Sequence, residues 1–404
     1  MFISCANTSK NNEKALHIKT DTIFSVKKAE KKVKKIIVGA NKTANYLPLI
    51  KNKRIGIVAN QTSVIFKEEG HTHLVDSLKA LGIHIKTVFA PEHGFRGHAD
   101  AGEAIKDGVD TKTGLPIVSL YGKNKKPYPS QIKNLDLIIF DIQDVGARFY
   151  TYISTLHYVM EACAEANIPV LILDRPNPNG HYTDGPILEA QHKSFVGLHP
   201  IPVVHGMTIA EYAKMINGEK WLANKVQCKL HIVSMDNYKH NVAYNLPIKP
   251  SPNLPNSTAI NLYPSLCFFE GTNVSVGRGT NQQFQVIGSP YFHLKAHHYS
   301  FTPKPNIGAK HPKHENKICY GLNLSQQNQS ASGINLEHLI TFYKANKKYH
   351  KDKPFFTNFF TKLAGTKKLQ TQIEAGLNAK EIKKTWQKDL DAYNKMRQVY
   401  LLYK

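Results

Sequence analysis

The chain has 404 residues, which is more than one hydrophobic core usually supports, so its length predicts more than one domain. Apolar residues make up 41% and charged residues 21% of the chain, a composition typical of globular proteins. The formal net charge of +23 is unusual, and much of the excess lies in residues 27–37 and in the Lys-rich segment 344–404.

These basic segments do not predict a nucleic-acid partner. The sequence contains no zinc-finger spacing, no RNP motif and no basic helix with interleaved aromatic residues. We therefore interpret the charge as solvated faces and tethers, and expect no nucleic acid among the partners. An attraction to anionic polymers of a cell envelope would use the same charge.

Cysteine spacing indicates neither a zinc site nor a redox motif, because no CxxC pair is present. No segment has the 18 or more consecutive apolar residues expected of a membrane-spanning helix. The cysteines are widely spaced, at Cys5, Cys163, Cys228, Cys267 and Cys319.

Cys5 differs from the other cysteines because of its surroundings. The start of the chain, MFISCANTSKNNEK, resembles the end of a bacterial lipoprotein signal, in which a cysteine after an apolar run is lipidated. The basic region and most of the apolar region of such a signal are absent, so either the true start lies upstream or a cytosolic protein matches by accident. We favour the first interpretation and expect a lipid anchor at Cys5 and a location in the cell envelope, periplasmic or membrane-anchored.

After a polar segment at residues 1–33 that we interpret as a flexible tether, short apolar runs alternate with segments of helical periodicity. This alternation predicts an α/β fold, with a Rossmann-like parallel sheet and crossover helices in residues 34–245. Thr208 and Glu211 form a capping box at the start of a helix. The other predicted elements are strands at 36–39, 54–59, 84–90, 117–120, 137–142, 169–173 and 202–205, and helices at 41–50, 73–81 and 151–167.

Polar residues follow the apolar runs at their carboxyl ends. The carboxyl ends of parallel strands lie on one edge of the sheet, where ligands bind in open α/β folds. The pattern therefore predicts a single crevice. The residues that follow five of these runs are Asn60, Glu92, Asp144, Asp174 and His205.

After about residue 245 the composition changes to Pro-, Asn- and Ser-rich sequence followed by a glycine-rich segment with Glu270, Asn273 and Arg278. The last sixty residues have mostly helical periodicity. We expect residues 246–404 to form a smaller mixed α/β domain whose glycine-rich loop faces the crevice.

Glu92 is the candidate for acid chemistry. A carboxyl group beside Pro91 and Phe95 would be partly desolvated, which favours its protonated form and suits a proton donor. The alternative is a salt bridge from Glu92 to Arg96 or Arg148. His93, His98 and Asp100 could be read as metal ligands, but their spacing is irregular and we expect no metal site.

Two arginine-containing turns are candidates for binding a ligand. Asp144 and Arg148 either form an ion pair that shapes the turn, or leave Arg148 and Tyr150 to bind an anionic or hydroxylated ligand. The next strand is also followed by an aspartate and an arginine, Asp174 and Arg175. Asn177 in the same turn adds amide groups of the kind found in sugar sites.

Nucleotide binding is not expected, because the sequence has no Walker A motif and no GxGxxG turn after its first strands. A GxSxG nucleophile elbow is also absent. We expect no cofactor.

Taken together, the ordered motifs of residues 35–404 resemble the exo-β-N-acetylmuramidase family, once known as a domain of unknown function. The resemblance implies a Rossmann-like domain, a smaller C-terminal domain and an active site in the cleft between them. It also implies removal of terminal N-acetylmuramic acid (MurNAc) from the non-reducing end of peptide-free peptidoglycan fragments such as MurNAc-GlcNAc, in cell-wall turnover and recycling. The motifs are VANQTS, APEHGFRG with DAGE, TGLPIVSLYG, FDIQDVGARFYTYISTL, LDRPNPNG with DGP, PIPVVHGMT, SPN and FEGTNVSVGRGT.

In this resemblance Glu92, in EHGFRG, is the expected general acid, and His93 or Asp144 orients it or the water. The 2-acetamido group of the substrate could itself assist, so a second carboxylate need not be the nucleophile. Arg148, Arg175 or Arg278 would bind the lactyl carboxylate of muramic acid. The predicted substrate-binding residues are Asn60, Arg96, Arg148, Tyr150, Asp174, Arg175, Asn177, Asn253, Glu270, Asn273 and Arg278. The alternative function is a non-catalytic muropeptide-binding lipoprotein.

Overall fold

The structure is a computed structural model, which describes residues 34–97, 107–292, 299–327, 333–350 and 352–403. Residues 36–404 form one compact unit. The predicted lipidation site Cys5 and two residues of the alternative metal site, His98 and Asp100, lie outside the described residues.

A seven-stranded sheet organises the first half of the unit, in the order β5-β6-β4-β1-β7-β8-β9. All neighbours pair in parallel except the short edge strand β5 (Gly108–Val109), which is antiparallel to β6. The mixed α/β class with a mostly parallel sheet is confirmed. The parallel strands are β1 (Ile55–Ala59), β4 (Ile85–Ala90), β6 (Pro116–Ser119), β7 (Leu137–Asp141), β8 (Val170–Leu173) and β9 (Leu230–Val233).

The order of the strands in the sheet indicates where a ligand can bind. Counted along the chain, the six parallel strands have the spatial order 3-2-1-4-5-6, so the chain moves outward in opposite directions from the central pair β1 and β7. Loops on either side of such a pair diverge, which leaves room for a ligand at the carboxyl ends of the strands. A small hairpin of β2 (Val64–Phe66) and β3 (His71–His73) follows β1.

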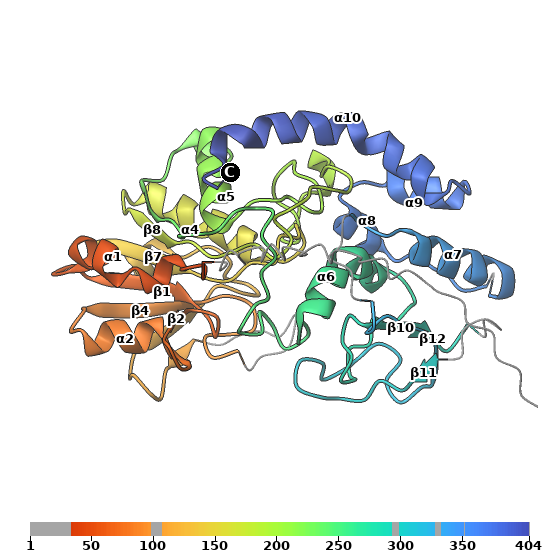
Figure 1. The fold of residues 1–404 in the computed structure, drawn as a ribbon, viewed down its shortest axis with the longest axis horizontal. Coiled ribbons are helices and arrows are strands. Elements are labelled where there is room, and N and C mark those ends of the chain that lie inside the picture. The colour runs from red at the N-terminus through yellow and green to blue at the C-terminus, as the bar shows by residue number, and fades with distance from the viewer. Residues whose placement is uncertain (1–33, 98–106, 293–298, 328–332, 351, 404) are drawn as a thin grey trace, which may run out of the picture. The chain divides into compact units, whose positions relative to one another are not determined.

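Both faces of the sheet are covered, because successive side chains of a strand point to opposite faces. In β7, Ile138 and Phe140 face a core that includes α4 (Tyr152–Glu165) and α5 (Ile209–Gly218). Leu137 and Ile139 face a second core. Helices α1 (Thr43–Ile50) and α2 (Leu74–Ala80) cover that second face (Figure 1).

The C-terminal part contains a three-stranded antiparallel sheet in the order β10-β12-β11 and a set of helices, which confirms a smaller mixed α/β region. Apolar residues of its helices belong to the same core cluster as α4 and α5. The predicted boundaries at residues 33/34 and 245/246 stay predictions. The elements are α6 (Ser257–Leu266), β10 (Val286–Ser289), β11 (Tyr299–Phe301), β12 (Cys319–Asn323), α7 (Glu337–Tyr349), α8 (Asn358–Ala364), α9 (Lys368–Glu374) and α10 (Ala379–Arg397), besides the four-residue α3 (Pro129–Ile132) of the first half.

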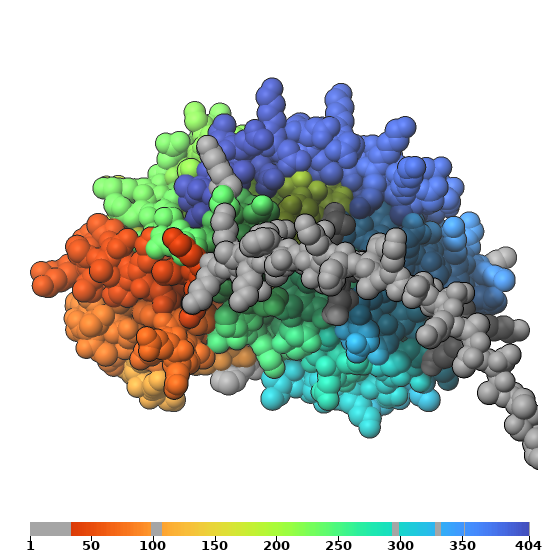
Figure 2. All heavy atoms as spheres, viewed as in Figure 1, coloured from red at the N-terminus to blue at the C-terminus, as the bar shows by residue number. Residues whose placement is uncertain are grey.

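Helix α10 returns the chain toward α5 (Figure 1). It starts at a capping box of Asn378 and Glu381, and buries Ile382, Trp386 and Leu390 at helical spacing. The opposite face of α10 is exposed and carries several lysines, so these basic side chains are solvated. In Figure 2, side chains of α10 extend outward along one edge of the molecule. No helix in the described part of the chain has the length and apolar content needed to cross a membrane.

Two predicted strands are wrong. Residues 36–39 contribute one bridge, from Ile37 to Asp236, and then enter a 3-10 helix at Gly39–Asn41. Around Val204 the chain also makes only isolated bridges, to Ala147 and Asp184. Val38 and residues 201–205 are buried, and an apolar run alone does not distinguish a strand from a packed loop.

A buried histidine pair joins helix α4, which contains His157, to His199. His157 Nδ1 and His199 Nε2 are 2.9 Å apart, and His199 Nδ1 lies 2.7 Å from the Tyr212 hydroxyl. The Trp221 ring stacks on His199 with centroids 4.5 Å apart. Burial lowers the pKa of His157 to about 4, although the nearby Glu161 carboxylate favours its charged form, and burial lowers the pKa of His199 well below its ordinary value.

This pair predicts an acid-sensitive fold. Below about pH 6.5 the unfolded chain binds protons at these histidines and the folded chain does not, so the stability is complete above that pH and is lost as the pH falls toward 4. We expect the free energy of unfolding, measured by urea titration, to fall by about 2 kcal/mol or more between pH 7 and pH 5. His157→Gln should flatten this slope.

His311→Gln is the control, because the side chain of His311 is 91% exposed. It should leave the slope unchanged. An equal slope in wild type and His157→Gln would contradict the assignment.

Candidate active site

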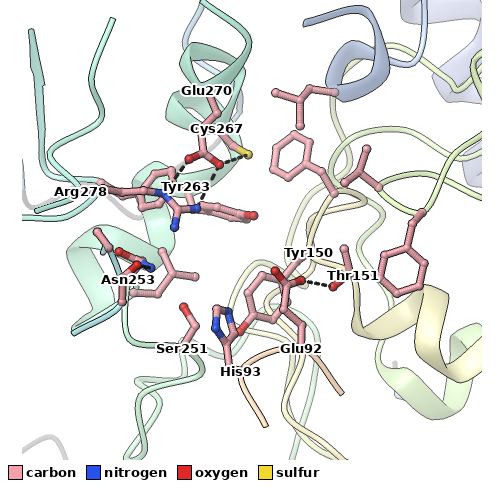
Figure 3. A pocket seen from close by; sticks show the side chains of 18 of the residues that line it. Glu92, His93, Tyr150, Thr151, Ser251, Asn253, Tyr263, Cys267, Glu270 and Arg278 are labelled. Carbon is pink, nitrogen blue, oxygen red and sulfur yellow. Dashed lines mark hydrogen bonds and ion pairs between the residues drawn. The ribbon is translucent and has the colours of Figure 1, made fainter. Parts of the chain in front are cut away.

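A cavity of about 810 Å³ opens at the carboxyl ends of β4, β6 and β7. Its lining combines the loops that follow these strands with residues 251–284, residues 308–313 and helix α8 (Figure 3). The position agrees with the crevice that the strand order predicts. Six of the predicted site residues line it: Glu92, His93, Tyr150, Asn253, Glu270 and Arg278.

Glu92 lies in the turn that follows β4. Thr151, at the start of α4, donates its hydroxyl to Glu92 Oε2 at 2.7 Å (Figure 3). Tyr121, from the loop after β6, is also hydrogen-bonded to Glu92; burial first, and then the charge and the hydrogen bond of Glu92, raise the pKa of the Tyr121 hydroxyl. His93 has a backbone φ of 70°, in the left-handed region, so the turn bends sharply at the cavity wall.

Arg278 and Glu270 form a bidentate ion pair on the other side of the cavity. Arg278 Nε lies 2.6 Å from Glu270 Oε1, and Nη2 lies 3.2 Å from Oε2. Burial disfavours the charged guanidinium, but the Glu270 carboxylate outweighs this and raises the pKa of Arg278. Figure 3 shows the third guanidinium nitrogen pointing away from Glu270. Left-handed glycines on both sides, with φ of 76° at Gly277 and 79° at Gly279, shape this loop.

Lys313 supports the segment that carries Glu270. Its ammonium group donates to four backbone carbonyls, those of Phe269 (3.2 Å), Glu270 (3.3 Å), Thr272 (2.5 Å) and Val274 (3.2 Å). Burial lowers the pKa of Lys313 to about 8. Sequence reasoning missed this residue, because a lysine in HPKHE gives no sign that it will be enclosed by carbonyls.

Aromatic rings form the wall between Arg278 and Glu92. The Tyr263 ring contacts those of Phe284 and Tyr150, with centroids 5.0 and 5.9 Å apart, and the Arg278 guanidinium lies 5.4 Å from the Phe284 centroid. The Tyr150 hydroxyl donates to the Pro250 carbonyl at 2.8 Å, so Tyr150 presents its ring rather than its hydroxyl. Tyr263 and Phe284 are not among the residues predicted for the site, because they come from a segment far along the chain.

Asn253 places an unsatisfied acceptor at the cavity. Its amide nitrogen donates to the Gly308 carbonyl at 2.7 Å, which fixes the side chain. Asn253 is 3% exposed, and its Oδ1 has no hydrogen-bond partner within the described ranges. A buried acceptor without a partner costs free energy, so a ligand that donates a proton to it would be favoured.

Arg148 is not in the cavity, which corrects the expectation that it binds a ligand or pairs with Asp144. It is fully buried, and its Nη1 donates to the carbonyls of Pro186 (2.9 Å) and Ile201 (2.7 Å). Its Nη2 donates to those of Leu363 (3.0 Å) and Ala364 (2.7 Å). Burial lowers the pKa of Arg148 to about 9, so it stays charged at neutral pH.

Asp144 is also outside the cavity lining. Its Oδ2 accepts from the Gly146 amide at 2.7 Å and lies 3.4 Å from His205 Nε2. Asp144 is 3% exposed and is not among the residues that line the cavity. The expectation that Asp144 orients the acid or the water is therefore corrected, and His93 is the remaining candidate.

The turn after β8 is structural. The Asp174 carboxylate accepts from Tyr403, Thr208 and the Ala210 amide, and burial raises its pKa to about 7. Arg175 forms a fully buried pair with Asp141 at 2.6 Å. Their predicted roles in substrate binding are corrected: both hold the sheet to its neighbours.

The other predicted binding residues also have partners outside the cavity. The Asn177 amide donates to the Met207 carbonyl at 2.9 Å, and the Asn273 amide donates to Asn346 at 2.9 Å. Arg96 pairs with Asp76 and Asp110 rather than with Glu92. Asn60 Oδ1 accepts from the Thr62 backbone amide at 2.9 Å, which caps the end of β1. None of these four residues lines the cavity.

The described residues include no group of three or more His, Cys, Asp or Glu side chains placed to hold a metal ion.

Arg148→Met tests the structural role of this arginine. It would remove one donor from each of four buried carbonyls, so we expect the free energy of unfolding to fall by roughly 3–5 kcal/mol. Urea unfolding measures the change. Arg54→Met is the control, because Arg54 forms an ion pair with Asp136 at the surface and should change stability little. A stable Arg148→Met variant that has lost ligand binding would contradict the assignment.

Comparisons with known proteins match most of the chain to one family. Residues 55–258 match the family description "Exo-beta-N-acetylmuramidase NamZ, N-terminal", and residues 261–403 match "Exo-beta-N-acetylmuramidase NamZ, C-terminal". The chain is 39% identical over 384 residues to a protein of Bacillus subtilis (strain 168) named peptidoglycan beta-N-acetylmuramidase NamZ, with 89% of each covered.

Two crystal structures share the fold. Both are DUF1343 family proteins from Bacteroides fragilis NCTC 9343. One is 46% identical with a TM-score of 0.83, and the match covers 92% of this chain and 99% of the other. The second is 27% identical with a TM-score of 0.75, and the match covers 91% and 99%.

Proposed function

Because the chain belongs to the exo-β-N-acetylmuramidase NamZ family, we propose that it is a glycoside hydrolase that releases terminal MurNAc from the non-reducing end of peptide-free peptidoglycan fragments. MurNAc-GlcNAc is the smallest substrate of this kind, and the activity would serve cell-wall turnover and recycling. The observation that carries the proposal is that a carboxyl group, Glu92, and a guanidinium group, Arg278, line one cavity. The Bacillus subtilis relative is named as an enzyme, which favours hydrolysis over a non-catalytic muropeptide-binding protein.

Glu92 is the proposed general acid. Hydrolysis of a glycosidic bond needs a proton on the leaving oxygen and stabilisation of the positive charge that develops at the anomeric carbon. Thr151 and Tyr121 hold the Glu92 carboxyl group in place, which fixes the direction of proton transfer.

The nucleophile is not Glu270, the other glutamate that lines the cavity. Arg278 binds both oxygens of Glu270, so Glu270 is poorly placed to attack the anomeric carbon. We propose that the 2-acetamido oxygen of the substrate forms the new bond to that carbon while the bond to the leaving sugar breaks and Glu92 protonates the leaving oxygen. Water then attacks the same carbon, the bond from that carbon to the acetamido oxygen breaks, and the Glu92 carboxylate takes the proton of the water, which regenerates the 2-acetamido group and the Glu92 acid.

Recognition of MurNAc uses the other end of the cavity. The lactyl ether of MurNAc carries a carboxylate that GlcNAc lacks, and a guanidinium nitrogen directed away from Glu270 can donate to it. Of the three arginines considered from the sequence, Arg278 is the one that lines the cavity. Asn253, which also lines the cavity, is the proposed partner of the acetamido group.

The location of the protein is a further proposal. A substrate derived from peptidoglycan fits a protein of the bacterial cell envelope, and Cys5 would supply a lipid anchor. Mass spectrometry of the membrane fraction for a lipidated Cys5 peptide would test the anchor.

Glu92→Gln tests the acid. The amide cannot donate a proton of suitable acidity, so we expect turnover of MurNAc-GlcNAc, followed as release of free sugars, to fall by roughly 10³-fold or more. Glu69→Gln changes an exposed glutamate elsewhere and should retain full activity. A folded Glu92→Gln variant with near-normal turnover would remove Glu92 from this role.

Arg278→Lys tests the recognition of the carboxylate. Lysine keeps the charge beside Glu270 but loses the planar fork, so we expect inhibition by free MurNAc to weaken roughly 10- to 100-fold and inhibition by free GlcNAc to change less than about 3-fold. Competitive inhibition constants measure both. Equal losses for the two sugars would contradict the role of Arg278.

A further inference from the structure

A second aromatic feature of the cavity is Phe195, which contacts Tyr121, the residue that is hydrogen-bonded to Glu92. Phe195 lines the cavity and is half-buried. Its backbone carbonyl accepts from the Ser154 hydroxyl of α4 at 2.7 Å, which anchors the residue beside the helix that holds Glu92 through Thr151. The mechanism proposed above does not use Phe195.

The Phe195 ring has a fixed environment. The Tyr121 ring meets it edge-on with centroids 5.9 Å apart, and the Tyr158 ring lies nearly parallel to it at 6.3 Å. The Lys125 ammonium lies 4.9 Å from the centroid of the Phe195 ring. A cation at this distance is attracted by the electron-rich face of the ring.

Contacts along the cavity wall give the order of its parts. From Arg278 the contacts run through Phe284, Tyr263 and Tyr150 to Tyr152, and the Tyr152 hydroxyl lies 3.5 Å from the Glu92 carbonyl. From Glu92 they continue through Tyr121 to Phe195. Along this path of contacts, Glu92 lies between Arg278 and Phe195.

This order decides which sugar each end can take. A proton donor must lie at the bond that is cleaved, with the terminal sugar on one side and the leaving sugar on the other. If the acidic terminal sugar lies toward Arg278, the leaving sugar extends toward Phe195. The cavity of about 810 Å³ lies in the upper part of the range of small-ligand sites, roughly 300–1,000 Å³, so it has room for two sugars.

On the basis of the proposed function, we propose that Phe195, Tyr121 and Lys125 form the subsite for the leaving sugar, a neutral N-acetylated hexosamine. The C–H groups on one face of a pyranose ring carry partial positive charge, so they pack on the Phe195 face in place of the Lys125 ammonium, by the same attraction. Lys125 then donates to hydroxyl or acetamido oxygens of that sugar. The terminal sugar does not contact Phe195.

The test compares two substrates that share the terminal sugar. MurNAc-GlcNAc fills both ends, whereas β-muramyl fluoride has no leaving sugar. We expect Phe195→Leu, which keeps the bulk but removes the ring, to lower the ratio of kcat/KM for the disaccharide to kcat/KM for the fluoride at least 10-fold. Phe195→Trp should restore the ratio to within about 3-fold of wild type.

Tyr349→Ala is the matched control, because Lys348 lies 4.9 Å from the centroid of the Tyr349 ring, outside the cavity lining. Its ratio should equal that of wild type. An unchanged ratio in Phe195→Leu would overturn the subsite, and so would an equal loss for both substrates, since Phe195 would then serve the terminal sugar. If wild type cleaves neither substrate, the proposed function fails, and the subsite fails with it.

Discussion

The buried guanidinium of Arg148 holds together the parts of the chain that form the active site. It belongs to the loop after β7 and donates to four carbonyls, two in the segment between Pro186 and Ile201 and two at the end of α8. A buried charge is stable only when it is hydrogen-bonded, and these four bonds stabilise the Arg148 guanidinium. This contact fixes the loop that leads into α4, and through Thr151 it fixes the position of Glu92. The geometry of the acid thus depends on an interaction outside the cavity.

The two ends of the cavity differ in chemistry. At one end, the Glu270–Arg278 pair lies beside the Lys313 ammonium enclosed by four carbonyls, so charges there are paired and fixed. At the other end, Phe195 and Tyr121 present aromatic surface, with Lys125 above it. Fixed dipoles and charges stabilise a ligand charge without reorganisation, and aromatic surface suits the apolar face of a sugar. A substrate with one acidic and one neutral sugar would therefore bind in a single direction.

The basic composition has two separate origins. Lysines on the exposed face of α10 are surrounded by water, and their charge influences association rather than the fold. Arg148, Arg278 and Lys313, in contrast, are hydrogen-bonded inside the protein, and Arg148 and Lys313 connect segments that are distant along the chain. Net charge therefore says little about the site, because the few cations that matter are the buried ones.

The sequence by itself determined the α/β class, the positions of five central strands and the presence of Glu92 at a ligand edge, because these depend on local periodicity and on residues next to a strand end. It also indicated Arg278, through the glycines on both sides. Only the tertiary structure decided which polar turns reach the cavity. Arg148, Asp144, Asp174 and Arg175 follow strands just as Glu92 does, but each is buried against a partner more than thirty positions away along the chain. The partners of a polar side chain are set by long-range packing, and local sequence cannot distinguish a residue that binds a ligand from one that binds the fold.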